Sequence, residues 1–188
     1  MIITKEFLKE HTACSPGYQW FLECGETDHE FVINKLIDED YTNWANWCIV
    51  RLMTPEQCVK YAIFSAELVI DNYEQKYPDD DRPRKAIEAV RNYLNNKTEE
   101  NRENAWSAAR SAENAARSAE GDAWCAARSA ASAAWCAARS AENAERSAEN
   151  AACAENAAFK TIITYGLSLL NEELNEAYNI KKTARVTN

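Results

Sequence analysis

The sequence predicts an all-α protein, and three observations carry this prediction. Residues 101–158 consist almost entirely of Ala, Ser, Arg, Glu and Asn, in a pattern that no other part of the chain shows. Gly and Pro are scarce, with four of each in 188 residues, which is a helical composition. No alternation of apolar and polar residues is long enough to favour a strand over a helix.

The opening of the chain predicts three short helices. Thr4 is a suitable N-cap for the first, Ser15 precedes a Pro where the second would start, and Gly25 fits its C-terminal end. The second helix presents Trp20 and Phe21, as core residues or as a docking edge. Helical spacing predicts that the third helix turns four apolar residues inward: Phe31, Val32, Leu36 and Ile37.

A fourth helix is expected over residues 40–53. Its Trp44 and Trp47 lie at helical spacing, which is more typical of a core than of a ligand cage. A fifth helix should begin after Thr54, because this residue can cap it and Gln57 can complete a capping box.

An acidic turn follows over residues 77–84. Asp79, Asp80 and Asp81 precede a helix whose positive end suits acidic side chains, and Asp81 can cap it. The cluster could bind a divalent cation through its oxygens, but it lacks the Gly and closing Glu of an EF-hand loop. A charged, capped turn is the preferred interpretation, and no metal or cofactor is predicted.

The unit AARSAEN recurs, with substitutions, from positions 108, 115, 126, 137 and 144. The steps are seven and eleven residues, which bracket the α-helical period, so the repeat keeps a small-residue face nearly straight. Thr98 should open this helical region. Its Ala and Ser face would let helices approach closely, and exposed Ala faces offer a route to self-association.

Three Trp residues of the repeat are each followed four positions later by Arg: Trp106 with Arg110, Trp124 with Arg128, and Trp135 with Arg139. On a helix this spacing places the guanidinium over the ring. One interpretation is a packing unit copied by duplication. The other is a ladder that binds a partner protein or a small anionic or planar ligand.

The repeat cannot be one straight helix in a compact chain. A helix over residues 101–158 would be about 87 Å long, whereas a compact chain of this size has a radius of gyration near 16 Å. We expect it to fold back into packed or stacked helices, with the best break at Gly121–Asp122. A second break is expected near Ala131–Ser132 or near Asn143.

The expected organisation is one compact domain with four segments. These are an acidic helical region over 1–98, the Ala-rich repeat over 99–158, a C-terminal packing helix over 159–180, interrupted at Gly166 in one reading, and a frayed tail over 181–188.

Charge and cysteine content limit the classes of function. The net charge is −9, and residues 1–100 carry 11 basic against 19 acidic side chains. This balance disfavours nucleic acid as a partner. It serves solubility alone, or it suits a basic partner. Seven Cys without a C-x-x-C pair, and no apolar leader or membrane span, indicate free thiols in a reducing cytoplasm.

Residues 41–94 carry YTNWANWCIVRLM, followed by YAIFSAELVIDNYEQKYPDDDRPRKAIEAVRNYL. These segments, with the Ala-rich repeat after them, resemble the immunity protein domain family of bacterial toxin systems, which bacteriophages also encode. The opening EFLKEHTACSPGYQWF is similar to the N-terminus of phage and bacterial relatives. The resemblance implies an all-helical protein that neutralises a toxic or defensive factor by binding it, and it supplies no catalytic motif.

Four hypotheses follow. The first is a non-enzymatic inhibitor of a toxin or defence protein, for immunity or for phage counter-defence. The alternative is a protein that sequesters a nucleotide-like signal with the Trp and Arg of the repeat. An enzyme using a Cys or the acidic cluster lacks a base at a telling spacing. A self-associating structural protein is the fourth. The candidate binding residues are the six of the ladder together with Asp79, Asp80 and Asp81.

Overall fold

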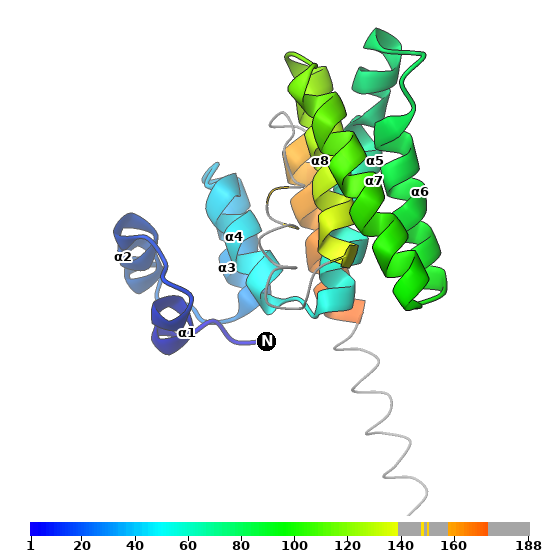
Figure 1. Ribbon diagram of the computed structural model, residues 1–188. Coiled ribbons are helices and arrows are strands. Elements are labelled where there is room, and N and C mark those ends of the chain that lie inside the picture. The colour runs from blue at the N-terminus through cyan, green and yellow to red at the C-terminus, as the bar shows by residue number, and fades with distance from the viewer. Residues whose placement is uncertain (139–147, 149, 151–157, 173–188) are drawn as a thin grey trace, which may run out of the picture.

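The computed structural model describes residues 1–138, 148, 150 and 158–172, and every regular element in this part of the chain is a helix (Figure 1). The labelled helices are α1 (Lys5–Glu10), α2 (Ser15–Cys24), α3 (His29–Asp38), α4 (Thr42–Leu52), α5 (Pro55–Lys76), α6 (Arg82–Asn95), α7 (Glu99–Arg117) and α8 (Asp122–Ala138). A further helix covers residues 158–172. The all-α prediction is confirmed.

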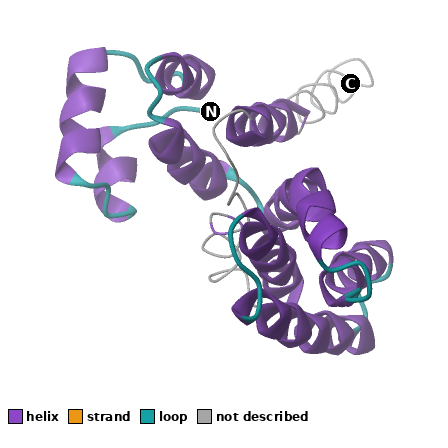
Figure 2. Cartoon of the chain, turned by 90° about the horizontal axis from the view of Figure 1, so that it is seen from above, coloured by secondary structure: helices purple, strands orange, loops and turns teal. Residues whose placement is uncertain are grey.

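The helices form two groups, which Figures 1 and 2 show from the side and from above. We call α1–α4 the N-terminal unit and α5–α8 the bundle. Within the bundle, α8 packs against α5, α6 and α7, while α3 packs against α4 in the N-terminal unit. The chain passes between the groups at Thr54, whose side chain and Gln57 form the predicted capping box at the start of α5.

The N-terminal unit follows most of the predicted signals. Thr4 caps α1 by accepting a hydrogen bond from the Phe7 amide at 3.1 Å, and Gly25 ends α2 with a φ of 72°. One prediction about its core is wrong. Phe31 is 49% exposed, and Ile33 is fully buried instead. Asp28 caps α3 through the Phe31 amide, so Phe31 belongs to the first turn, on its exposed side.

Helix α8 lies at the centre of the bundle, and its small side chains allow the other helices to pack closely around it. Twelve of its 17 residues are buried. All twelve are Ala, Ser or Cys: Ala123, Ala126, Ala127, Ser129, Ala130, Ala131, Ser132, Ala133, Ala134, Cys136, Ala137 and Ala138. A helix that is buried nearly all round needs side chains that its neighbours can approach. Small residues provide this, because they let three helices crowd around one.

The repeat folds back where the sequence predicted. Helix α7 begins after Thr98, which accepts a hydrogen bond from the Asn101 amide at 3.2 Å. The turn after α7 contains Gly121 with a φ of 60°, and α8 begins at the next residue. The second break expected near Ala131–Ser132 is wrong, because both residues are buried inside α8. The alternative at Asn143 lies outside the described residues.

Buried Ala residues of α7 form the heptad seam against its neighbours: Ala105, Ala109, Ala112, Ala116 and Ala119, the last just beyond the helix end. Their steps of four and three residues keep one side of the helix small. The seventh-residue Ala series of the repeat is buried wherever its side chains are described up to Ala137. The prediction that Ala provides close-packing faces is confirmed for α7 and α8.

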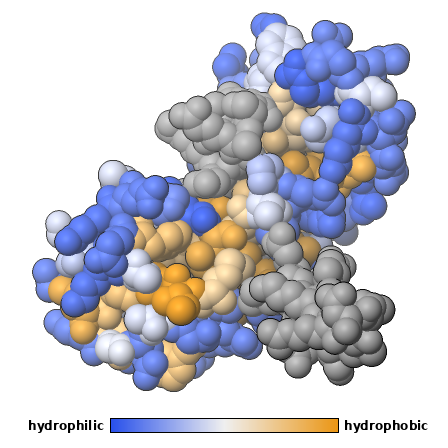
Figure 3. Space-filling model, turned by 90° about the horizontal axis from the view of Figure 1, so that it is seen from below, coloured by the Kyte–Doolittle hydropathy of each residue, from blue (hydrophilic) through white to orange (hydrophobic). Residues whose placement is uncertain are grey.

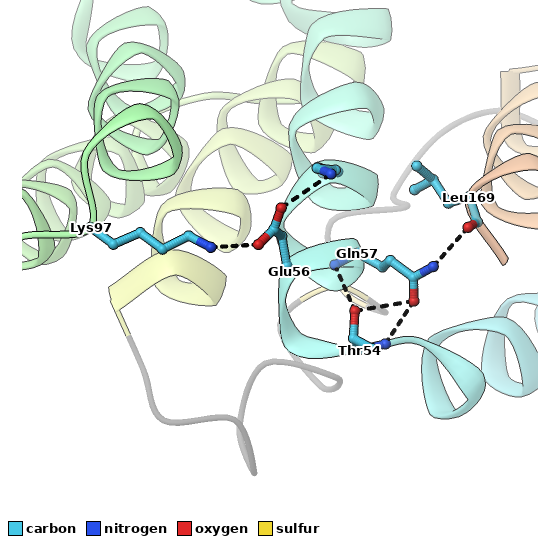
Figure 4. Close-up of polar contacts among 6 residues, drawn as sticks. Thr54, Glu56, Gln57, Lys97 and Leu169 are labelled. Carbon is cyan, nitrogen blue, oxygen red and sulfur yellow. Dashed lines mark hydrogen bonds and ion pairs between the residues drawn. The ribbon is translucent and has the colours of Figure 1, made fainter. Parts of the chain in front are cut away.

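The helix over residues 158–172 lies against both groups. A Cβ on Gly166 would come within 2.8 Å of both Ile49 of α4 and Tyr61 of α5. The Gln57 side-chain amide donates to the Leu169 carbonyl at 2.7 Å (Figure 4). One alternative in the sequence analysis was that Gly166 interrupts this helix, and that alternative is wrong. Gly166 permits the helix to approach two others.

No helix in the described residues is both long and apolar enough to cross a membrane. The division of the chain into segments 1–98, 99–158, 159–180 and 181–188 stays a prediction.

Candidate binding surfaces

Helices α7 and α8 carry five of the six predicted Trp and Arg residues. The guanidinium of Arg128 lies 5.1 Å from the centre of the Trp124 ring, and that of Arg110 lies 4.9 Å from the Trp106 ring on α7. Trp106 is 43% exposed and Trp124 is 37% exposed, which is unusual for such large apolar side chains. The predicted stacking geometry is confirmed at both pairs.

The two helices bring their ladders together. Trp106 of α7 meets the half-buried Trp135 of α8 edge to face, with ring centres 5.8 Å apart. Trp124, Arg128 and Trp135 follow at helical spacing on α8, where Trp124 and Arg128 are exposed and Trp135 is half-buried. We call these five residues, Trp106, Arg110, Trp124, Arg128 and Trp135, the Trp–Arg face. Arg139, the last member of the predicted ladder, lies outside the described residues.

A hollow of about 370 Å³ lies beside the Trp–Arg face, between α7 and α8. Residues that line it include Glu113, Arg117, Trp124, Arg128, Ser132 and Trp135. Arg117 pairs with Glu113 at 3.5 Å and is strongly exposed. The hollow therefore combines two indole rings with two guanidinium groups, a combination that can stack on a planar group and neutralise an anionic one.

The three adjacent Asp residues of the acidic turn differ in their contacts and do not converge on a cation site. Asp80 accepts hydrogen bonds from the Tyr73 hydroxyl at 2.6 Å and from the Arg82 guanidinium at 2.5 and 2.7 Å. The Arg82 hydrogen bonds, with that from Tyr73, hold the pKa of Asp80 well below its usual range. Burial and the hydrogen bond to Asp80 raise the pKa of Tyr73 to about 12.

Asp81 occupies the N-cap position of α6, but its side chain makes no capping hydrogen bond. It pairs with Lys85 at 2.8 Å instead, while Asp80 accepts from the Arg82 amide at 3.2 Å. The capping role predicted for Asp81 therefore belongs to Asp80. Asp79 is exposed at the same turn. Within the part of the chain that the structure describes, no group of three His, Cys, Asp or Glu is placed to hold a metal ion.

The N-terminal unit contains a second pocket, of about 280 Å³, that the sequence did not single out. Residues from all four of its helices and the loop after α1 line it, among them Ala13, Trp20, Phe21, Leu36, Trp44 and Trp47. Trp44 and Trp47 are only half-buried, so the expectation that they belong to the core is incomplete. No local pattern signals this pocket, because residues from Ile3 to Cys48 line it together only through tertiary packing.

Two buried thiols near these surfaces, those of Cys48 and Cys136, are not suited to nucleophilic attack. Burial raises the pKa of the Cys48 thiol to about 12, and burial also raises the pKa of Cys136 well above its ordinary value. A thiol that stays protonated at neutral pH is a poor nucleophile. The described cysteines are free thiols, and Cys14 is the exposed one among them.

Two family models match the chain. One, described as Imm-5 like putative immunity protein, covers residues 49–161, which is more than half of the 188 residues. The other, described as YdhT N-terminal domain, covers residues 1–53. The two matches meet at the end of α4, where the N-terminal unit gives way to the bundle. No curated protein and no solved structure matches the chain.

Proposed function

The chain belongs to the Imm-5 like putative immunity protein family through residues 49–161, and on this premise we propose that it neutralises a protein toxin by binding it. The protein acts without catalysis, in the cytoplasm, by covering a surface that the toxin needs. The family suggests the toxin-neutralising role. The absence of catalysis, the cytoplasmic location and the covering of a toxin surface are our proposal.

The observation that carries the proposal is the exposure of Trp106 and Trp124 beneath stacked Arg side chains. Trp and Arg are the residue types that most often dominate binding energy in protein interfaces. Each stacked pair is held in place before a partner arrives, so little side-chain entropy remains to be lost on binding. Both Trp residues lie inside the segment that matches the immunity family.

The charge of the chain favours a basic target. With a net charge of −9, the protein attracts a positively charged toxin over a distance and accelerates their encounter. The Arg residues of the Trp–Arg face then require carboxylates or carbonyl groups at the centre of the toxin surface. We therefore expect a toxin that is basic overall and has an acidic or polar patch where the Trp rings dock.

The test is to search the neighbourhood of the gene for a toxin gene, to co-express the chain with that toxin, and to measure growth and binding. Replacing both Trp106 and Trp124 with Ala should weaken toxin binding by about a hundredfold or more, since two interface anchors are lost. The same variant should no longer protect growing cells. The double variant should keep the helical circular dichroism of the parent, because both side chains are exposed.

A matched control is Leu68→Ala. Leu68 is 41% exposed on α5, so this variant also removes a large exposed apolar side chain, but from another part of the bundle. It should bind the toxin as the parent does. Full protection by the Trp106 and Trp124 double variant would show that the binding face lies elsewhere.

The hollow of about 370 Å³ beside Trp124 supports a second candidate function, the sequestering of a nucleotide-like anion. Two indole rings could enclose a base while Arg117 and Arg128 pair with phosphate. A rise in melting temperature with one member of a nucleotide panel, lost in Arg128→Ala, would favour this function over toxin binding. An unchanged melting temperature across the panel would count against it.

A further inference from the structure

We propose that the pocket of the N-terminal unit is a separate docking site, which takes one apolar side chain from a basic segment of a partner protein. The pocket is distinct from the Trp–Arg face, because it is built from α1–α4 and lies outside the segment that matches the immunity family. The proposal therefore does not depend on toxin binding by the bundle.

The size and lining of the pocket fit one large apolar side chain. Its volume is about 280 Å³, and three Trp rings and Phe21 contribute to its walls. An apolar cavity of about 150 Å³ is large enough to hold benzene. A Leu, Phe or Trp side chain therefore fits with room for the adjoining backbone at the mouth.

The walls of the pocket are fixed by contacts at their outer edges. The Trp20 indole donates to Glu39 at 2.6 Å, and the Trp44 ring stacks on Tyr41 with centres 4.4 Å apart. The guanidinium of Arg51 lies 4.2 Å from the Trp47 ring centre. These contacts hold the three rings in position, so a guest side chain does not have to order them.

The backbone at the rim supports the same interpretation. Thr12, which lines the pocket between α1 and α2, has a φ of 55°, in the left-handed region that β-branched residues rarely adopt. Such strain persists where the surroundings enforce it, and it is concentrated at binding and active sites. Here it sets the sharp turn that brings α2 back over the pocket.

The charge around the pocket identifies the kind of partner. Residues 1–53 contain nine Asp and Glu but four Lys and Arg, and all nine carboxylate residues are exposed. Glu39 lies at the pocket wall, where it accepts from the Trp20 indole, and the exposed Glu10 and Asp38 are two positions in sequence from the lining residues Thr12 and Leu36. Lys35, 5.8 Å from the Trp20 ring centre, and Arg51 over Trp47 are the cations that these carboxylates outnumber. On one side of the N-terminal unit, hydrophobic residues gather at the centre with hydrophilic ones around them (Figure 3). An acidic surround attracts Lys and Arg beside the inserted side chain.

The experiment uses the full chain and end-blocked, fluorescein-labelled peptides with one central residue and two flanking residues on each side. The centre is Leu, Phe, Trp or Ser, and the flanks are Lys, Ser or Glu. Fluorescence anisotropy should show that an apolar centre with Lys flanks binds at least about tenfold more tightly than the same centre with Glu flanks, a difference of about 1.4 kcal/mol. A Ser centre should bind weakly with any flank.

Variants connect this binding to the pocket. Ala13→Phe and Asn43→Phe each place a ring in the pocket from a different lining position, and Asn43 is exposed, so its replacement should not disturb folding. Both should abolish binding of the Lys-flanked peptides. Reversing the charge of Glu10 and Asp38 to Lys should weaken the Lys-flanked peptides about tenfold and leave the Ser-flanked ones unchanged. Glu88→Lys with Glu103→Lys, on α6 and α7, is the matched control.

Several results would overturn the proposal. Peptide binding that neither Phe variant reduces, or that does not depend on flank charge, would place the interaction outside this pocket. Concentration-dependent dimers that Asn43→Phe dissolves would assign the pocket to a second copy of the chain. Tighter peptide binding by a chain that ends at residue 172 would assign it to the chain's own basic C-terminal residues. Loss of toxin binding has no bearing on these readouts.

Discussion

Neighbouring carboxylates of the acidic turn differ in what they contribute. The Asp80 side chain is about three-quarters buried and accepts hydrogen bonds from Tyr73 and Arg82. The Asp81 side chain is 62% exposed and, among the contacts described, pairs with the exposed ammonium of Lys85. A charge-assisted hydrogen-bond network that is partly buried stabilises more than an exposed ion pair at (i, i+4). We therefore expect Asp80 to contribute more than Asp81 to the free energy of unfolding.

We predict that Asp80→Asn lowers the free energy of unfolding at pH 7 by about 1–2 kcal/mol. The folded-state pKa of Asp80 lies below the unfolded value of about 3.9, so its contribution is fully present above that pH and is lost as the pH falls below it. Urea denaturation should show a parent–variant difference that is constant from neutral pH to about pH 5 and shrinks towards about pH 2.

The control for this prediction is Asp81→Asn, which should cost about 0.5 kcal/mol or less at neutral pH. Equal losses for the two variants would mean that the network around Asp80 has no special role. A difference that grows on acidification would contradict the direction of the Asp80 pKa shift.

At the scale of the element, the sequence predicted helix ends better than helix faces. Thr4, Thr54 and Thr98 all cap as expected, because a cap depends on residues within one turn. Phe31 was misplaced because its spacing on α3 fits the inward face, while burial depends on which helices lie opposite. A local pattern cannot supply that information.

The Trp–Arg stacking was predictable for the same local reason, since Arg128 stands four residues after Trp124 on one helix. The pocket of the N-terminal unit was not predictable. Its walls come from α1 to α4, and Trp20 and Trp44 line the same pocket only because of tertiary packing. The break near Ala131–Ser132 was wrong because α8 passes through the centre of the bundle, where it packs against α5, α6 and α7.

The central position of α8 leads to a prediction about its small residues. Ala130 is fully buried, so Ala130→Leu adds three carbon atoms where three helices already crowd together. We expect the free energy of unfolding to fall by about 1–3 kcal/mol or more through overpacking. Ser107→Leu, at an exposed position of α7, is the control and should change it by less than about 0.5 kcal/mol. A neutral Ala130→Leu in urea denaturation would show that α8 is loosely packed.

At the scale of the whole molecule, side-chain contacts as well as the backbone connection join the two units, each of which has its own family match. The Tyr61 hydroxyl of α5 donates to the Asn46 side chain of α4 at 2.6 Å. The helix over residues 158–172 then covers this junction, with Gly166 close to Ile49 and Tyr61. Lys160 pairs with Asp40 of the N-terminal unit at 2.6 Å. Side-chain contacts and the helix over residues 158–172 therefore join the two units.

We predict that removing residues 158–188 weakens this coupling. Ile49 and Tyr61 would become exposed and Gln57 would lose the Leu169 carbonyl, so the shortened chain should bind a hydrophobic dye and unfold in two urea transitions instead of one. A chain that ends at residue 172 keeps all of these contacts and is the control, with a single transition near that of the parent. One unshifted transition in both shortened chains would mean that the hydrogen bond from Tyr61 and the packing around it suffice to join the two units.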